Sequence, residues 1–150
     1  MVSSRTFRVC LLLLALTAVV QAQALKPANS TNAKDFLGKW QGRFHGKVFV
    51  TIVLTGDGQK LAGTMSKASI ELNEDGSLAS AEPTDGSNSI SHAEVNGKEL
   101  RFTSESNDGT GDPVDWEMVL VGADEAELQP IVPPDVPKPK PWKLTRIPRS

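Results

Sequence analysis

Hydrophobic and polar side chains alternate with a period of two along most of the chain beyond residue 37. The clearest run covers residues 47–55. One face carries Val48, Val50, Ile52 and Leu54, and the other carries the polar Lys47, Thr51 and Thr55 together with Phe49 and Val53. Successive side chains of a strand point to opposite faces, so this pattern is typical of a β-strand. Helical periodicity is confined to a short turn at 32–36, which Ser30 or Thr31 could cap. We therefore predict an all-β fold.

Tight turns separate the alternating runs. Asn96-Gly97 is the strongest two-residue hairpin signal in the chain, and Gly56-Asp57-Gly58 is a second turn of the same kind. Strands are predicted at residues 38–44, 47–55, 60–66, 90–95, 99–104, 114–121 and 142–147, with weaker ones near 70–72, Leu78 and 126–128. Residues 83–89 are predicted to be a loop because all seven are of the types that cluster in loops: proline, glycine, serine, threonine, asparagine and aspartate. Residues 130–141, in which six of twelve are proline, should be an extended crossover.

Strands that follow one another through hairpins pair with their neighbours and form a meander. Closing a meander into a barrel removes its two open edges, so we favour an antiparallel barrel of about eight strands over an open sandwich. The residues predicted to point inward are Trp40, Phe44, Val48, Val50, Ile52, Leu54, Leu61, Met65, Leu100, Phe102, Trp116, Met118, Leu120, Leu128, Trp142 and Leu144. A barrel of this size can be filled by its own side chains or can hold one small ligand.

The first 24 residues have the three parts of a secretory signal peptide. Arg5 and Arg8 precede an apolar run at 9–20, and Ala22-Gln23-Ala24 is a small-residue cleavage pattern. The run is too short to span a bilayer as a helix. We expect residues 1–24 to be a signal peptide, 25–37 a leader with a short helical turn, and 38–150 the barrel domain. The protein should then be exported, periplasmic or secreted, and free of the membrane after cleavage.

Charge and cysteine content narrow the choice of partners and compartment. Removing the signal peptide takes away Arg5 and Arg8, so the formal net charge falls from −2 to −4. A mildly acidic surface argues against nucleic acid as a partner. Cys10, the single cysteine, lies in the signal peptide, so the remainder has no disulfide and no thiolate nucleophile. A small exported domain without disulfides fits a bacterial periplasm or exterior better than a eukaryotic secretory pathway.

Residues that could carry catalysis or hold a metal are few. His45 and His92 are the two histidines and lie far apart in the sequence, whereas a zinc site needs three or four converging ligands. No serine lies in a Gly-x-Ser-x-Gly elbow. The acidic loop at 107–112 lacks the regularly spaced oxygen ligands of a calcium-binding loop. We therefore predict a protein that is not an enzyme and has no metal or cofactor.

Short motifs at both ends of the domain carry a family resemblance. Gly38-Lys39-Trp40 opens the first predicted strand, and Arg146 ends the last. This layout resembles the lipocalin (calycin-type) pattern, in which such an arginine lies over the tryptophan and closes one end of the barrel. The chain is most similar to small exported bacterial lipocalin-like domains of unknown function, which share the motifs Gly-x-Trp-x-Gly, Gly-x-x-Leu-x-Gly-Thr (here residues 58–64) and Trp-x-Leu-x-Arg. The resemblance implies structural roles for Gly38, Trp40 and Arg146.

Two classes of function remain open. The resemblance and the aliphatic interior suggest a barrel that binds a small apolar ligand, with Met65, Phe102, Trp116 and Met118 as the expected lining. Alternatively, the barrel is solid and acts through its surface, as a periplasmic protein-interaction module or a protease inhibitor. Residues 83–89 and 130–141 would then contact the partner.

Overall fold

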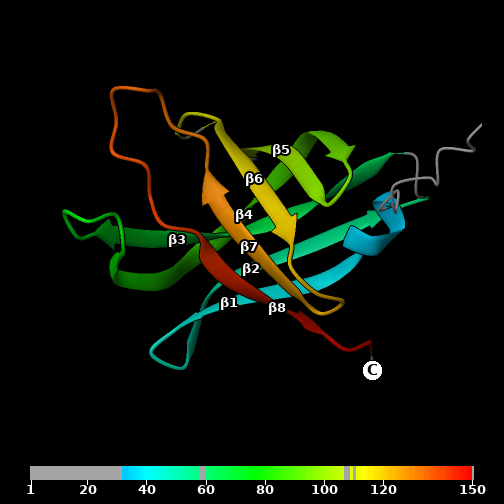
Figure 1. Ribbon diagram of the computed structural model, residues 1–150, viewed down its shortest axis with the longest axis horizontal. Coiled ribbons are helices and arrows are strands. Elements are labelled where there is room, and N and C mark those ends of the chain that lie inside the picture. Colours follow the sequence, from blue (N-terminus) through cyan, green and yellow to red (C-terminus); the bar gives the residue numbers. More distant parts are fainter. Residues whose placement is uncertain (1–31, 58–59, 107–108, 110, 150) are drawn as a thin grey trace, which may run out of the picture.

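Each strand of the chain pairs with the next in sequence, and the last pairs with the first (Figure 1). The computed structural model describes residues 32–57, 60–106, 109 and 111–149. Its strands, all paired antiparallel, are β1 (Gly38–Phe44), β2 (Lys47–Gly56), β3 (Leu61–Leu72), β4 (Leu78–Asn96), β5 (Glu99–Ser106), β6 (Val114–Leu120), β7 (Glu125–Pro130) and β8 (Trp142–Ile147). The predicted all-β meander closed as a barrel is therefore confirmed. The predicted signal peptide and most of the leader lie outside the described residues.

A single turn of 3-10 helix, η1 (Ala33–Phe36), covers one end of the barrel. Its N-cap is Asn32, whose side chain accepts a hydrogen bond from the Lys34 amide, while the Asn32 amide donates to the Asp35 carboxylate. This reciprocal arrangement satisfies two backbone donors that a helix start otherwise leaves unpaired. The candidate caps Ser30 and Thr31 are outside the described residues. The helical turn brings Phe36, which is fully buried, onto the end of the core.

Trp40 and Arg146 lock this covered end. The Trp40 indole donates to the Phe36 carbonyl at 2.9 Å, and the Arg146 guanidinium lies 4.1 Å from the centre of the Trp40 ring. Arg146 also donates to the backbone carbonyls of Leu37, Asp35 and Ala123. One side chain thus joins η1, β1, β8 and the turn between β6 and β7. This is the stacked pair that the lipocalin-like layout implied.

Replacing Arg146 with lysine is expected to lower the free energy of unfolding by about 1–2 kcal/mol, because a lysine cannot stack flat and reach several carbonyls at once. Urea unfolding of the purified protein measures this loss. Arg43→Lys is the matched control, since Arg43 is exposed and makes its hydrogen bonds at the surface. Equal stability of the Arg146→Lys variant and the control would show that the guanidinium group of Arg146 contributes little to the free energy of unfolding.

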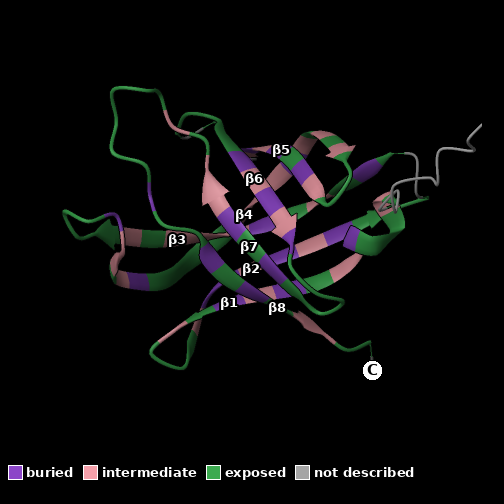
Figure 2. Ribbon diagram, in the orientation of Figure 1, coloured by how far each residue is buried: buried purple, intermediate pink, exposed green. Residues whose placement is uncertain are grey.

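The core follows the predicted alternation over most strands (Figure 2). Its fully buried side chains include Trp40, Ile52, Leu54, Leu100, Met118, Leu128 and Leu144. One prediction is wrong at the start of β2. Val48 is only half-buried, while Phe49 is 1% exposed; Phe44, at the end of β1, is half-buried and packs against the core as predicted.

A β-bulge explains this error. Gly42 pairs with Val50, but the next residue of β1, Arg43, pairs with Val48, so the residue between them on β2 has no partner of its own. A one-residue offset turns the side chains of a strand to opposite faces. Phe49 therefore points inward and packs edge-on against Trp142, at a ring distance of 5.6 Å.

The segment 83–89 is strand rather than loop. It continues β4, and Ala68 of β3 pairs with Pro83 across the ladder. The ladder between β4 and β5 begins only at Asn88, so in the first half of β4 only one edge is hydrogen-bonded to a neighbour in the sheet. Proline is tolerated where no partner needs its missing N–H. The resulting β3–β4 hairpin extends beyond the barrel wall, toward the left in Figure 1.

The proline-rich crossover, residues 131–141, links β7 to β8 without helix or strand, and it bends at a turn in which the Val136 amide donates to the Pro133 carbonyl. The tip of the β3–β4 hairpin holds it. Gly76 accepts a hydrogen bond from the Lys140 amide, and the Lys140 ammonium forms a 2.6 Å ion pair with Asp75. The lysine and Ser77 both lower the pKa of Asp75 by stabilising its ionised form. The crossover and the hairpin therefore flank the end of the barrel opposite η1, which we name the mouth.

Candidate functional site

The middle of the barrel is filled by side chains. Phe102 and Met118, two of the four residues predicted to line a ligand pocket, are 2% and 0% exposed. Leu100, Leu128 and Leu144 are equally buried around them. A tightly packed interior leaves no room for a ligand at this level. Any pocket inside the barrel must therefore lie nearer one of its ends.

A pocket of about 320 Å³ opens at the mouth. Its described lining residues are Val50, Met65, Ser66, Lys67, Ala68, Ile70, Thr84, Asn88, Ser104, Ser106, Gly111, Asp112, Val114 and Trp116. The structure thus brings Met65 and Trp116, the other two predicted lining residues, to one pocket. Both are at least nine-tenths buried and form its apolar floor with Val50.

Backbone register explains why these residues meet. Met65 of β3 pairs with Asn88 of β4, and Asn88 pairs in turn with Ser106 of β5. Residues that face one another across neighbouring strands point to the same face of the sheet. Met65 is buried in the core, so Asn88 and Ser106 also face the interior. The inner wall changes from apolar to polar toward the rim.

Ser104 is the single buried polar residue in the described part of the chain. Its hydroxyl oxygen accepts a 2.9 Å hydrogen bond from the Trp116 indole. This bond fixes the indole ring against the floor of the pocket. A hydroxyl can accept and donate at once, so Ser104 still has a proton to donate.

Asn88 contributes a second polar group to the wall. Its amide oxygen is buried and has no hydrogen-bond partner. Such orphan acceptors are rare in folded proteins because burial removes water without replacing it. The Trp142 indole N–H is the other orphan found among the described side chains. The ring centres of Trp142 and Trp116 lie 5.5 Å apart, so both groups without a partner lie at the mouth end of the barrel.

Sequence reasoning missed Asn88 and Ser104. Ser104 ends the strand predicted at 99–104 and continues the alternation of Leu100 and Phe102, so the pattern places its side chain inside. Asn88 lies two residues before the buried Ile90, but the composition of its segment predicts a loop. The alternation on both strands was the available signal.

The described lining of the mouth pocket has balanced formal charge. Lys67 and Asp112 are the two ionisable residues among its described members, and they carry opposite signs. The described residues of the pocket therefore offer no surplus positive charge to hold an anion and no surplus negative charge to hold a cation.

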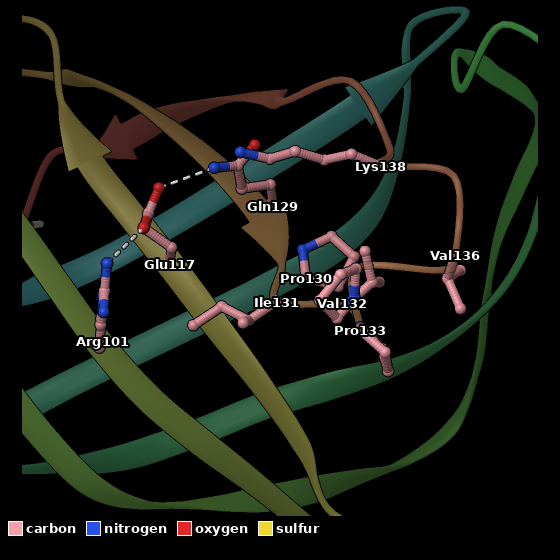
Figure 3. Close-up of a pocket in the computed structure, with 10 residues that line it drawn as sticks. Arg101, Glu117, Gln129, Pro130, Ile131, Val132, Pro133, Val136 and Lys138 are labelled. Atoms are coloured by element: carbon pink, nitrogen blue, oxygen red, sulfur yellow. Dashed lines mark hydrogen bonds and ion pairs between the residues drawn. The ribbon is translucent and has the colours of Figure 1, made fainter.

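A second hollow, of about 350 Å³, lies outside the barrel beneath the crossover (Figure 3). Its floor is the outward face of β5, β6 and β7, where Glu117 accepts hydrogen bonds from Arg101 at 3.2 Å and from Gln129 at 2.7 Å. Residues of the crossover form its wall, including Ile131 and Val136, each 44% exposed. We name this hollow the outer groove.

The two histidines lie away from both hollows. His45 is in the turn between β1 and β2, and His92 lies where the β4–β5 register shifts. Both are exposed and adopt a positive φ of 48°. In the described part of the chain, no three metal-ligating side chains gather in one place. No helix among these residues is long and apolar enough to cross a membrane.

Comparison of the chain with protein-family models, curated proteins and solved structures finds no match. The fold class of this protein is therefore established by its own geometry. The strand order and the pairing of β1 with β8 define a closed, eight-stranded antiparallel barrel, an architecture consistent with a lipocalin-like barrel.

Proposed function

We propose that this protein is an exported, non-enzymatic β-barrel that binds one small, largely apolar molecule at its mouth. The observation that carries this proposal is the mouth pocket, with Met65 and Trp116 at its floor. Binding sites for small molecules are concave, mostly apolar and equipped with a few polar groups, and they range from about 300 to 1,000 Å³. The mouth pocket meets each of these criteria and lies near the lower limit of size.

The chemistry of the lining supports binding rather than catalysis. Its described residues include hydroxyl and amide groups but no histidine or cysteine. A hydrolytic or nucleophilic mechanism needs a nucleophile with a base in hydrogen-bond reach, or a strongly shifted carboxyl. Ser104, the buried hydroxyl, faces the Trp116 indole, which is not a base. Export remains a proposal based on the predicted signal peptide.

Titration with an environment-sensitive apolar dye tests the proposal. We expect saturable binding near one equivalent, with quenching of tryptophan emission, because Trp116 forms part of the floor. A bound ligand should also raise the melting temperature, since it binds the native state alone. Small aromatic molecules should displace the dye.

Two isoleucine variants locate the dye. Ile70→Trp places a large side chain in the mouth pocket, whereas Ile131→Trp places the same side chain in the outer groove. We expect the first to abolish dye binding and the second to leave it within about twofold. Loss of binding in Ile131→Trp alone would move the site to the outer groove.

The outer groove favours a second candidate function, contact with a protein partner. Interaction surfaces often present exposed apolar side chains rimmed by polar ones, and Ile131 and Val136 stand beside Arg101 and Lys138. Under this alternative, Ile131→Asp should abolish recovery of a specific partner from a periplasmic extract, while Ile70→Trp should not. Equal recovery with wild type and Ile131→Asp would count against it.

A further inference from the structure

We infer that the mouth pocket selects a compact, uncharged ligand whose polar edge carries a hydrogen-bond donor beside an acceptor, as an amide does. This inference rests on the proposed function and names its ligand class. Three observations lead to it: an orphan amide oxygen beside a hydroxyl that can still donate in the wall, the balanced charge of the described lining, and the shallow depth of the pocket.

The polar wall of the pocket can be satisfied by a ligand that supplies one hydrogen-bond donor and one hydrogen-bond acceptor. The Asn88 amide oxygen is buried without a partner, so it needs a donor. The Ser104 hydroxyl accepts from Trp116, and it keeps its own proton to donate to a ligand. Register places the two residues on neighbouring strands, since Ile90 pairs with Ser104 and Asn88 is two positions from Ile90. Diagonal neighbours of this kind lie about 7–8 Å apart between Cα atoms.

The amide of Asn88 reaches the pocket by rotation about its last torsion angle. This torsion has a broad energy profile in asparagine, so the turn costs little. A ligand N–H would then satisfy Asn88, and a ligand carbonyl would accept from Ser104. A group that carries both at adjacent atoms is an amide or a lactam. Because the acceptor is otherwise left unpaired, the protein gains more from this ligand than from one without the donor.

The charge of the described lining and the depth of the mouth pocket both disfavour long-chain fatty acids as ligands. Lys67 and Asp112 leave the described lining without surplus positive charge, so a carboxylate would lose its hydration without a dedicated counterion among these residues. Phe102 and Met118 fill the barrel below the floor, so an alkyl chain cannot extend inward. A flat ring lying against the Trp116 indole and Met65 fits the remaining space.

Three naphthalene compounds that differ in one group provide the test. 2-Naphthamide has a donor and an acceptor, methyl 2-naphthoate has the acceptor alone, and 2-naphthoate is charged. Calorimetric titration of the full protein is expected to give an affinity for the amide about tenfold or more above that for the ester. The carboxylate should bind most weakly.

Two pocket variants assign the polar contacts. Asn88→Leu should reduce the affinity for the amide to that for the ester and leave the ester unaffected. Ser104→Ala should weaken both, because both have the carbonyl that it contacts. Ser91→Ala is the matched control for Ser104→Ala, since Ser91 lies on the neighbouring strand and its hydroxyl donates to Glu105. This control should bind all three compounds as wild type does.

The melting temperature of Asn88→Leu gives a readout that a merely structural role would not produce. Leucine has a similar shape and removes an orphan buried acceptor, so the unliganded variant should melt at the same temperature as wild type or above it. A lower affinity together with an unchanged or higher melting temperature supports a binding role for Asn88.

The outcomes separate this inference from the proposed function. Equal affinities of wild type for amide and ester, or a preference for the carboxylate, overturn the inference and leave the mouth as a binding site. Absence of saturable binding by all three compounds overturns both. If Asn88→Leu fails to fold, the wild-type series still decides between these results.

Discussion

Replacement of Trp40 by alanine is expected to lower the free energy of unfolding by about 4 kcal/mol. Trp40 is fully buried, donates to the Phe36 carbonyl and carries the Arg146 guanidinium on its ring. Alanine removes all three contributions and leaves a cavity beneath η1. A domain of this size is typically stable by about 5–15 kcal/mol, so the loss is a large share of the total.

Chemical unfolding followed by circular dichroism measures this loss, with the slope checked for two-state behaviour. Trp40→Phe serves as the control, because it keeps an aromatic face under Arg146 but not the indole N–H. It should cost clearly less than Trp40→Ala. A loss below about 1 kcal/mol for Trp40→Ala would contradict the view that this end of the barrel is held by Trp40, since a cavity alone costs more than that.

Gly63→Ala is the second substitution for which we expect a large effect, about 3 kcal/mol, the upper part of the range for overpacking. A β-carbon on Gly63 would lie 1.9 Å from the Val53 carbonyl oxygen on the adjacent strand. Backbone atoms cannot move aside as the end of a flexible side chain can. Either the ladder between β2 and β3 must separate, or the barrel must deform.

Gly122→Ala is the control for this substitution. A β-carbon there would meet nothing closer than 3.8 Å, and the backbone φ of Gly122 is not positive. We expect a neutral or slightly stabilising change, because alanine restricts the unfolded chain. Thermal unfolding of both variants checks the pair. A Gly63→Ala variant as stable as Gly122→Ala would mean that the β2–β3 ladder is looser than this geometry implies.

Much of the fold could be predicted because the barrel obeys local rules. The alternation of apolar residues sets the inner face, and Asn96-Gly97 marks a turn. The bulge that turns Phe49 inward could not be predicted, because it depends on pairing between Gly42 and Val50 across two strands. The length of β4 was missed for a similar reason. Pro83 looks like a strand breaker until the free edge beside it is known.

The candidate site could be predicted in its apolar half and not in its polar half. Met65 and Trp116 belong to the alternating pattern, so their inward direction follows from sequence. How deeply the interior is filled does not follow, because it depends on side-chain volumes meeting across the barrel. Phe102 and Met118 pack at the centre for that reason. The lack of a hydrogen-bond partner for the Asn88 amide oxygen can be recognised only when the positions of all its neighbours are known.

The three tryptophans give the most direct measurement of where a ligand binds. Trp116 lines the mouth pocket and Trp142 packs against it, whereas Trp40 lies under Arg146 at the covered end. Each supplies one indole N–H resonance in a ¹⁵N–¹H NMR spectrum. During titration with 2-naphthamide we expect the Trp116 and Trp142 resonances to shift together and the Trp40 resonance to stay in place. A shift of Trp40 alone, or of none of the three at saturating ligand, would contradict binding at the mouth.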